Sequence, residues 1–325
     1  MLILSQQERD RTSQYLDQLS RSGTIDPIRE HSCIYRSHDF PETRLVLKLE
    51  TQGAMYALKA DTQAPITDRL RKEYDLLCQL AEYFDDKKTS QVVRPIYLSS
   101  AGDFMVTEYI KRPTAVDLIY NGPDNDQVAQ VYRRAGAWLN DLHGFRPPKD
   151  YGFRPKWMTD SIRDLSENLP ANLAGTSQRM INTMLAEAAR LKGTPDIQVF
   201  AHGDFHGLNL IMGQGKTIGL DFTEAREKLA VYDIVDFLKA DIFRDSQPSD
   251  VDRSGILKRN KDMFFRLYRH PINMDILDFC IRGRLLKDWL FLSQPSHVCS
   301  EFEDHRRTRL EIRLKQAFNL PRSSG

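Results

Sequence analysis

The chain has 325 residues, with 46 Lys and Arg against 45 Asp and Glu, and a formal net charge of +1. This balance excludes a bulk preference for nucleic acid, and a mean hydropathy of −0.50 is typical of an ordinary soluble protein. No apolar stretch approaches the ~20 residues that span a bilayer. The first residues, MLILSQQERDRTSQYL, lack the basic and apolar regions of a signal peptide, and the four cysteines have no C-x-x-C spacing. We therefore expect a cytoplasmic protein with reduced thiols and no stable membrane insertion.

The first hundred residues predict strands interrupted by one helix. The runs 32–36, 44–50 and 54–61 alternate apolar and polar residues or are rich in β-formers, and TQG between the last two predicts a hairpin. Residues 68–84 have apolar side chains at helical spacing. The runs 92–100 and 103–110 return to strand, with a turn at SAGD.

Beyond the segment KRPTAVD the pattern becomes mainly helical. Residues 127–145 and 176–191 predict amphipathic helices, KDYGFRPKWM predicts a loop, and four more helices follow residue 228. The expected fold class is α+β and bilobal. A small antiparallel N-lobe with one helix spans residues 1–110, and a large mainly helical C-lobe spans residues 111–325.

The stretch FAHGDFHGLNLIM, residues 200–212, carries the strongest chemical signal. LNLIM and TIGLDF are apolar runs joined by GQGK, which predicts a hairpin with glycines at the reversal. Asp204 precedes this hairpin, and Asn209 and Asp221 occupy the open ends of its two strands. An oxygen-rich cluster of this kind suits Mg²⁺, which prefers one or two carboxylates together with water and phosphate oxygens.

Two charged residues of the N-terminal part also need partners. Lys59 lies inside a predicted strand, and Glu73 falls on the apolar side of the predicted helix with Leu70 and Leu77. Because a charge on a core-facing stripe is usually paired, we expect Lys59 to pair with Glu73. A strand lysine, a helix glutamate and the Asp, Asn and Asp of the hairpin together match the parts of a kinase-type phosphoryl-transfer site.

The motif H-G-D-x-x-x-x-N at 202–209, with I-G-L-D-F at 218–222, resembles the signature of the aminoglycoside phosphotransferase and choline kinase-like family. The resemblance covers roughly residues 28–240 and implies a protein-kinase-like fold that transfers a phosphoryl group from ATP or GTP with Mg²⁺. It implies Asp204 as the catalytic base and Asn209 and Asp221 as the metal ligands.

For the nucleotide, the resemblance implies that Lys59, held by Glu73, grips the phosphates. Glu108–Ile110 would meet the adenine through backbone hydrogen bonds, and Ser32 is a candidate phosphate contact. One departure is that no glycine lies between His31 and Glu50, so no Gly-rich loop covers the phosphates. His143 and Asp233 are expected to be structural.

Three other functions stay open. A pseudokinase scaffold would bind nucleotide without turnover, although the site residues are intact. GDFHG resembles an element of metallophosphoesterases, but their later G-D-x-x-D and G-N-H-D/E elements do not follow. A protein kinase would need an A-P-E segment after Asp221, and none occurs.

The acceptor is expected to be a small molecule with a hydroxyl group, such as a sugar, a glycan or an amino alcohol. From residue 256 onward there are 14 Lys and Arg against 8 Asp and Glu, which weakly disfavours polycationic aminoglycosides. The basic run HRRTRLEIRLKQ, residues 305–316, is compatible with peripheral contact to an anionic membrane or with a solvated helix face. The oligomeric state is not predicted.

Overall fold

A computed structural model describes residues 2–122, 124–167 and 169–320 of the chain. The chain divides into two compact units. The first comprises Met1–Pro113 and Ile211–Glu224, and the second comprises Thr114–Leu210 and Ala225–Gly325. The sequence-based division at residue 110 placed 211–224 in the C-terminal part. In the structure this segment returns to the first unit, because its strand β10 (Thr217–Gly219) pairs in parallel with β4 (Ser90–Val92).

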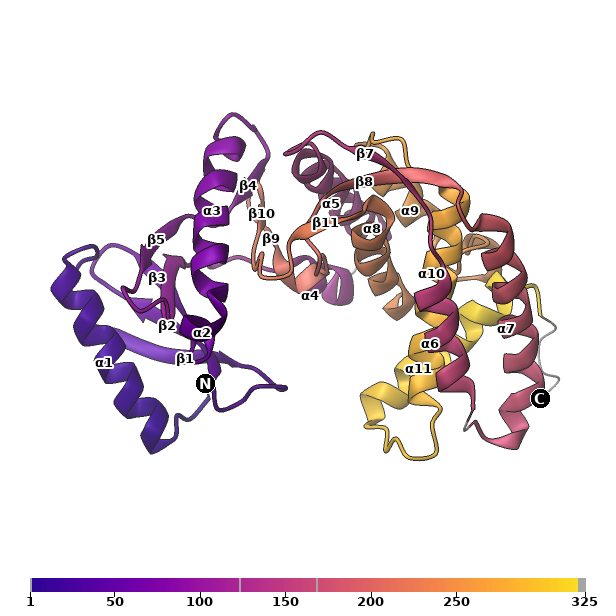
Figure 1. Cartoon of the computed structure of the whole chain (residues 1–325), viewed down its shortest axis with the longest axis horizontal. Helices are drawn as coiled ribbons and strands as arrows, with labels where there is room; N and C mark the ends of the chain where they lie inside the picture. Colours follow the sequence, from indigo (N-terminus) through magenta and orange to yellow (C-terminus); the bar gives the residue numbers. More distant parts are fainter. Residues whose placement is uncertain (1, 123, 168, 321–325) are drawn as a thin grey trace. The chain divides into compact units, whose positions relative to one another are not determined.

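A five-stranded antiparallel sheet forms the body of the first unit (Figure 1). Its strands lie in the order β1 (Glu30–Arg36), β2 (Arg44–Glu50), β3 (Met55–Asp61), β6 (Phe104–Glu108) and β5 (Pro95–Leu98). The alternation read from the sequence is visible in β2, where Leu45, Leu47 and Leu49 are buried and the residues between them are not. Successive side chains of a strand point to opposite faces, so one face of the sheet is apolar.

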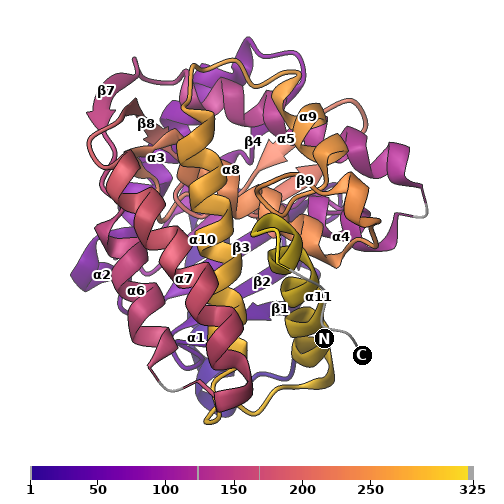
Figure 2. The ribbon, with the colours of Figure 1, turned by 90° about the vertical axis from the view of Figure 1, so that its right-hand side faces the viewer.

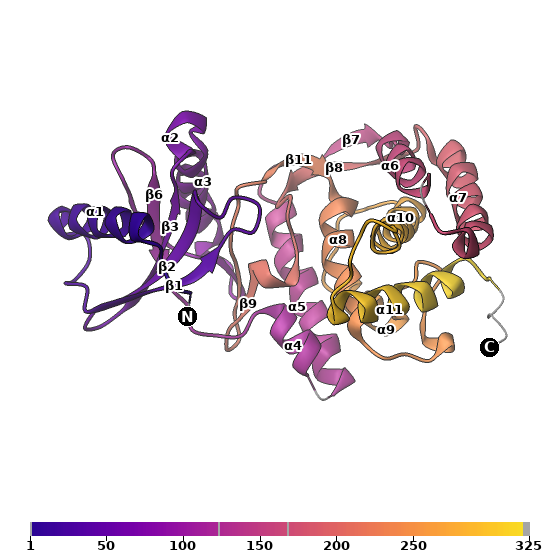
Figure 3. The ribbon, with the colours of Figure 1, turned by 90° about the horizontal axis from the view of Figure 1, so that it is seen from below.

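Helices cover both faces of this sheet (Figure 3). On the apolar face, Tyr15 and Leu19 of α1 (Gln6–Ser22) join a core cluster with β1, β2, β3 and β6. On the other face lies α3 (Arg69–Asp85), preceded by the short α2 (Ala64–Thr67). The sequence analysis contained α3 but not α1, although Ser5 and Glu8 form a capping box at the start of α1.

A small sheet with the strand order β4-β10-β9 contains the predicted hairpin. The strand β9 (Leu210–Met212) is all buried, and Gly215 in the reversal has a φ of +72°, which favours glycine. The chain passes from the second unit into the first between Leu210 and Ile211.

The second unit is mainly helical. Its central helix, α10 (Met274–Leu292), packs against four others, as Figures 2 and 3 show. These are α6 (Lys156–Ser166), α7 (Ala171–Leu191), α8 (Ala230–Leu238) and α11 (Glu301–Ala317). The remaining helices are α4 (Ala115–Asn121), α5 (Asn125–His143) and α9 (Lys258–Phe265), and α5 packs along α9.

The predicted loop KDYGFRPKWM is wrong. Its first residues form β7 (Lys149–Gly152), and its last residues begin α6. The strand β7 pairs with β8 (Pro195–Ala201), which pairs in turn with β11 (Arg226–Leu229) in an antiparallel sheet. An exposed edge strand of charged and glycine residues carries no apolar alternation, so its sequence resembles a loop.

The basic run 305–316 lies on α11, and all five of its Lys and Arg residues form ion pairs. The pairs are Arg306–Asp288, Arg307–Asp304, Arg309–Asp245, Arg313–Asp241 and Lys315–Glu311. Arg313 is buried. The run therefore presents its cations to acidic partners within the unit. No helix of the described residues is long and apolar enough to cross a bilayer.

Candidate active site

Lys59 and Glu73 meet on the face of the first unit's sheet that α3 covers. Lys59 lies between Leu58 and Ala60 of β3, so its side chain points away from the apolar core beneath those two residues. Its Nζ donates to Glu73 Oε1 at 3.0 Å and to Oε2 at 2.9 Å. The Glu73 side chain is only 1% exposed, so the ammonium neutralises a carboxylate that has lost its hydration. The predicted pairing is present.

Asp221 follows β10 and reaches the same lysine. Its Oδ1 accepts hydrogen bonds from Lys59 Nζ at 2.8 Å and from Thr223 Oγ1 at 2.7 Å. Its φ of +54° is in the left-handed region, which aspartate tolerates better than most side chains. The sequence analysis did not name Thr223, whose signal was only its position two residues after the aspartate.

The three groups set one another's protonation. Burial would lower the pKa of Lys59, but the charges of Asp221 and Glu73 outweigh it and raise the pKa above its usual range. Burial raises the pKa of Glu73, and the charge of Lys59 opposes that shift. With Lys59 charged and both carboxylates ionised, the cluster has a net charge of −1, which favours a further cation near Asp221.

The donor set at Asp221 fits Mg²⁺. Its carboxylate is a hard oxygen donor on a side chain that is 41% exposed, and Lys59 and Thr223 hold it in position. Among the residues the structure describes, no three His, Cys, Asp or Glu side chains cluster as metal ligands. Mg²⁺ commonly takes only one or two protein carboxylates and completes its shell with water and phosphate oxygens, so this finding agrees with the fit.

A small cavity of about 80 Å³ adjoins Lys59 and Asp221 within the first unit. Arg44 and Arg69 also line it, and both donate to Oδ2 of the buried Asp61 at 2.8 Å. Lys59, Arg44 and Arg69 supply N–H donors for phosphate oxygens, although each is already paired with a carboxylate: Lys59 with Glu73 and Asp221, and both arginines with Asp61.

Ser32 does not line this cavity. It pairs with Lys48 in the middle of β1. The lining serine is Ser37, the first residue after β1, whose Oγ accepts the N–H of Phe40 at 3.2 Å. The sequence analysis missed Ser37, although its position at a strand end was a usable signal.

The segment Glu108–Ile110 leaves β6 with only some of its backbone groups engaged. Glu108 N–H donates to Arg94 O, and the Glu108 carboxylate accepts the Arg94 N–H at 2.9 Å. Tyr109 N–H donates to Met55 O. Within the described part of the chain, Ile110 N–H donates no hydrogen bond. The side chain of Glu108 therefore braces the strand, and the backbone is what this segment offers a base.

The second unit holds the remaining predicted residues in the loop before β9. Asn209 Nδ2 donates to Asp204 O at 3.0 Å and lies 3.3 Å from Asp204 Oδ2. His206 Nε2 also lies 3.3 Å from Asp204 Oδ2, and the Asp204 side chain is 50% exposed. Asn209 and His206 thus fix the direction of a carboxylate that still reaches solvent.

A buried aspartate anchors the start of this loop. Asp233 of α8 accepts the N–H of His202 at 2.7 Å and that of Gly203 at 2.9 Å. Gly203 has a φ of +86°, and its carbonyl accepts Lys228 Nζ at 3.0 Å. His143 Nε2 also lies 3.1 Å from Asp233 Oδ2. The geometry of His143 and Asp233 therefore agrees with the structural role expected of each.

The protonation states of this anchor follow from its burial. Burial lowers the pKa of His143 despite its hydrogen bond to Asp233, so the imidazole is neutral near pH 7. Burial would raise the pKa of Asp233, but His143, His202 and the Gly203 N–H together lower it. The buried phenol of Tyr268, whose pKa is raised by burial, lies 2.8 Å from His143 Nδ1 and donates to it. A neutral His143 therefore donates from Nε2 to an ionised Asp233.

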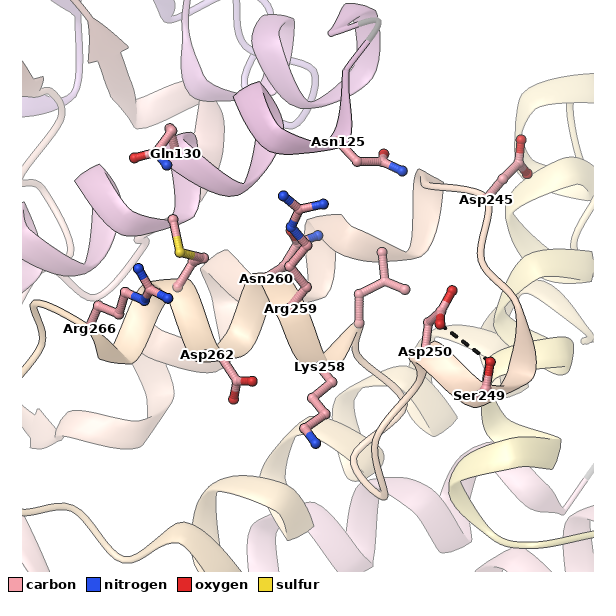
Figure 4. A pocket seen from close by; sticks show the side chains of 12 residues that line it. Asn125, Gln130, Asp245, Ser249, Asp250, Lys258, Arg259, Asn260, Asp262 and Arg266 are labelled. Atoms are coloured by element: carbon pink, nitrogen blue, oxygen red, sulfur yellow. Dashed lines mark hydrogen bonds between the residues drawn. The ribbon is translucent and has the colours of Figure 1, made fainter.

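Asp204, His206 and Leu208 line a cavity of about 500 Å³ in the second unit. Its other walls include Tyr120, Phe243 and Phe302, and the rings of the last two stack with centroids 5.4 Å apart. A larger cavity of about 690 Å³ opens beside α5 and α9 (Figure 4). Its labelled side chains are polar, and none comes from the Asp204 loop, so size alone does not mark the site.

The model of a family described as the phosphotransferase enzyme family matches residues 41–260. No curated protein sequence matches the chain.

Solved structures match nearly the whole chain. Spectinomycin phosphotransferase in complex with ADP and spectinomycin has a TM-score of 0.59 at 14% identity, covering 94% of this chain and 98% of its own. Amicoumacin kinase in complex with AMP-PNP, Ca²⁺ and a ligand named Ami has a TM-score of 0.57 at 17% identity, with 96% coverage of each chain. Glucosamine kinase in complex with glucosamine, ADP and inorganic phosphate has a TM-score of 0.61 at 15% identity, covering 96% of this chain and 83% of its own. At these identities the likeness shows the fold, which is the kinase-like α+β fold predicted from the sequence.

Proposed function

This chain belongs to the phosphotransferase enzyme family, and from that premise we propose that it transfers the γ-phosphoryl group of ATP to a hydroxyl of a small molecule. The observation that carries the proposal is the Asp204 loop. A half-exposed carboxylate is oriented by Asn209 and His206, anchored through Asp233, and set in the wall of a cavity large enough for a small acceptor.

Asp204 is the proposed catalytic base. Its carboxylate would accept a hydrogen bond from the acceptor hydroxyl and take the proton as the new O–P bond forms, while the bond from the γ-phosphorus to the β–γ bridging oxygen breaks and ADP leaves. Phosphoryl transfer needs little covalent help from the protein, so positioning and charge stabilisation supply most of the catalysis. The hydrogen bond from Asn209 and the contact with His206 keep the carboxylate aimed at the cavity.

The first unit is the proposed nucleotide-binding part. Lys59, held by Glu73, would contact phosphate oxygens, with Ser37 beside it in the small cavity. Ser32, the phosphate contact expected from the resemblance, lies away from that cavity. The N–H of Ile110, which donates no hydrogen bond within the described residues, would meet the adenine edge together with the carbonyl of Glu108, which also accepts Thr107 Oγ1 at 3.3 Å.

Asp221 and Asn209, the two residues that the family resemblance implies, are the proposed ligands of Mg²⁺. The ion would offset the charge of the phosphates. Asp221 supplies a carboxylate oxygen, and Asn209 supplies Oδ1, because its Nδ2 is engaged with Asp204. Both donors are of the hard oxygen type that Mg²⁺ prefers.

Calorimetry with ATP, in the presence and absence of Mg²⁺, tests the nucleotide site. Asp221→Asn removes the charge while keeping a side chain that tolerates the left-handed backbone, and it should abolish the Mg²⁺-dependent part of the affinity. Asp39→Asn, at an exposed residue of the same unit, is the matched control and should bind like the wild type. Equal Mg²⁺-dependent affinity in both variants would refute the role of Asp221.

An ATP-consumption screen over sugars, amino alcohols, aminoglycosides and nucleosides then tests turnover. At least one class should stimulate consumption well above the rate with water alone. Nucleotide binding with only slow hydrolysis in every class would refute the phosphotransferase and support a nucleotide-binding scaffold.

A further inference from the structure

A second cavity adjoins the one that contains Asp204. It measures about 420 Å³, and Gly203, Asp236 and Arg284 line both cavities. Its other walls come from the turn between β7 and α6, from β8 and β11, and from α8. A ligand that places a hydroxyl at Asp204 can therefore extend past Asp236 and Arg284 into this second cavity.

The second cavity carries an excess of positive charge. Four cations line it against two carboxylates: Arg154, Arg226, Lys228 and Arg284 against Glu227 and Asp236. Among the described residues, Arg154 and Arg226 form no ion pair. Arg154 makes only a cation–π contact with Tyr151, at 5.4 Å from the ring centroid.

Among the described residues, the two carboxylates pair with cations other than Arg154 and Arg226. Glu227 Oε1 lies 3.6 Å from Arg146 Nη1, and Asp236 Oδ1 lies 3.3 Å from Lys239 Nζ. Asp236 also lies 3.9 Å from Arg284 Nη2. The positive charge of Arg154 and Arg226 is thus left uncompensated.

The cavity at Asp204 differs in this respect. Its cations each have an acidic partner: Lys239 and Arg284 pair with Asp236, and Arg306 pairs with Asp288. Its remaining wall is largely apolar and includes three aromatic rings, those of Tyr120, Phe243 and Phe302. An uncharged, ring-like part of a ligand fits there, whereas a negative group fits the adjoining cavity.

The geometry points to the second cavity as a cationic subsite that binds a phosphate or carboxylate group of the acceptor. Guanidinium groups pair with these oxyanions through two parallel hydrogen bonds, and the exposed Arg154 and Arg226 are accessible to such a group. The inference rests on the proposed function and narrows it. The acceptor is a hydroxyl compound that carries negative charge, and an ammonium group in the same position would be repelled.

Trp157 provides a local signal for a binding test. Its ring lines the cationic subsite and is 38% exposed, whereas Trp138 and Trp289, the other two tryptophans of the chain, are 0% and 1% exposed. The test titrates Trp157 fluorescence with two matched pairs, ribose against ribose 5-phosphate and glucose against glucuronate, and with glucosamine. Saturating ADP is present throughout, so that the probes do not occupy the nucleotide site.

At least one anionic member should bind about tenfold or more tightly than its neutral partner and than glucosamine, since each charge-assisted hydrogen bond contributes at least that factor. The two pairs show whether phosphate or carboxylate is preferred. Arg154→Gln with Arg226→Gln should remove the preference. Arg179→Gln with Lys192→Gln removes the same charge from exposed sites on and just after α7 and should leave the preference intact.

Equal binding of charged and neutral partners, tighter binding of glucosamine, or a preference that survives Arg154→Gln with Arg226→Gln would overturn the inference. Phosphoryl transfer from ATP, measured on the same compounds, separates this failure from failure of the function. Transfer to glucosamine but to neither anion would keep the phosphotransferase and reject the cationic subsite. Anion binding without transfer to any compound of the wider screen would keep the subsite and reject the phosphotransferase.

Discussion

Replacing Asp233 with asparagine tests how the Asp204 loop is held. Asp233 is 1% exposed and accepts three hydrogen bonds, from His202 N–H, Gly203 N–H and His143 Nε2–H. An asparagine keeps the shape but only one acceptor oxygen. If the asparagine oxygen accepts the hydrogen bonds of His202 and His143, the asparagine NH₂ group points at the Gly203 N–H, and two donors then face each other.

The expected cost follows from these contacts. A hydrogen bond to a charged group contributes about 1.5–3 kcal/mol, and the variant loses one outright and weakens two, so Asp233→Asn should lower the free energy of unfolding by about 2–4 kcal/mol. Turnover should fall on the order of 100-fold, because misplacing a reacting group by about 1 Å has that effect.

Urea unfolding and steady-state kinetics measure both effects, with Asp160→Asn as the control. Asp160 pairs with Lys156 at the surface, so its loss should change the free energy of unfolding by less than about 1 kcal/mol. The folded pKa of Asp233 lies below the 3.8 of an ordinary aspartate, so its stabilising effect is present above pH 3.8 and is lost as the pH falls through the folded pKa. The difference in the free energy of unfolding between wild type and Asp233→Asn should therefore narrow as the pH falls below 3.8. Unchanged stability and turnover in Asp233→Asn at pH 7 would refute the anchoring role.

Three further predictions concern the two units separately. Because burial lowers the folded pKa of His143 below 6.5, the wild type should lose stability as the pH falls below 6.5, and His143→Gln should flatten that part of its urea-unfolding profile; an identical slope would contradict a buried neutral imidazole. Lys59→Met should lower the free energy of unfolding by about 3–5 kcal/mol, because it leaves the buried Glu73 carboxylate without its cation. Lys59→Met with Glu73→Leu should recover part of that loss. A double variant no more stable than the single variant would count against the pairing. Gly207→Ala should reduce thermal stability and turnover, because a Cβ there would lie 2.7 Å from a methyl group of α4. The control Gly175→Ala, whose Cβ would have nothing within 4 Å, should raise the free energy of unfolding by about 0.5–1 kcal/mol. Equal melting temperatures of the two variants would contradict the close packing of the Asp204 loop.

Local patterns predicted β2 and β3 well, and β2 alternates strictly, whereas the single strand expected over 92–100 falls on the end of β4 and on β5, which belong to different sheets. The runs 44–50 and 54–61 match β2 and β3 nearly residue for residue, and the pairing of Lys59 with Glu73 followed from a lysine inside a strand and a glutamate on the apolar side of a helix. The helix α1 escaped notice because its apolar face is narrow, although its capping box was readable. The return of 211–224 to the first unit depends on the parallel pairing of β10 with β4, which no local pattern encodes.

In the candidate site, too, local patterns revealed residues close in sequence but not residues that only the folded chain brings together. The spacing of Asp204 and Asn209 within one loop was readable, because the residues are near neighbours in the sequence. Ser32 was expected from the family resemblance alone, and Ser37, which lines the cavity beside Lys59, was not considered. The cationic subsite was not visible at all, since Arg154 and Arg226 come from separate elements that only the folded chain brings to one cavity.

The central claim is that Asp204 catalyses transfer of a phosphoryl group from ATP. The most direct measurement follows radiolabel from [γ-³²P]ATP into an acceptor found by the screen, with wild type and Asp204→Ala compared at equal nucleotide saturation. The account predicts that Asp204→Ala binds ATP and Mg²⁺ much as the wild type does but transfers label at least about 100-fold more slowly. Transfer by Asp204→Ala at close to the wild-type rate would contradict it.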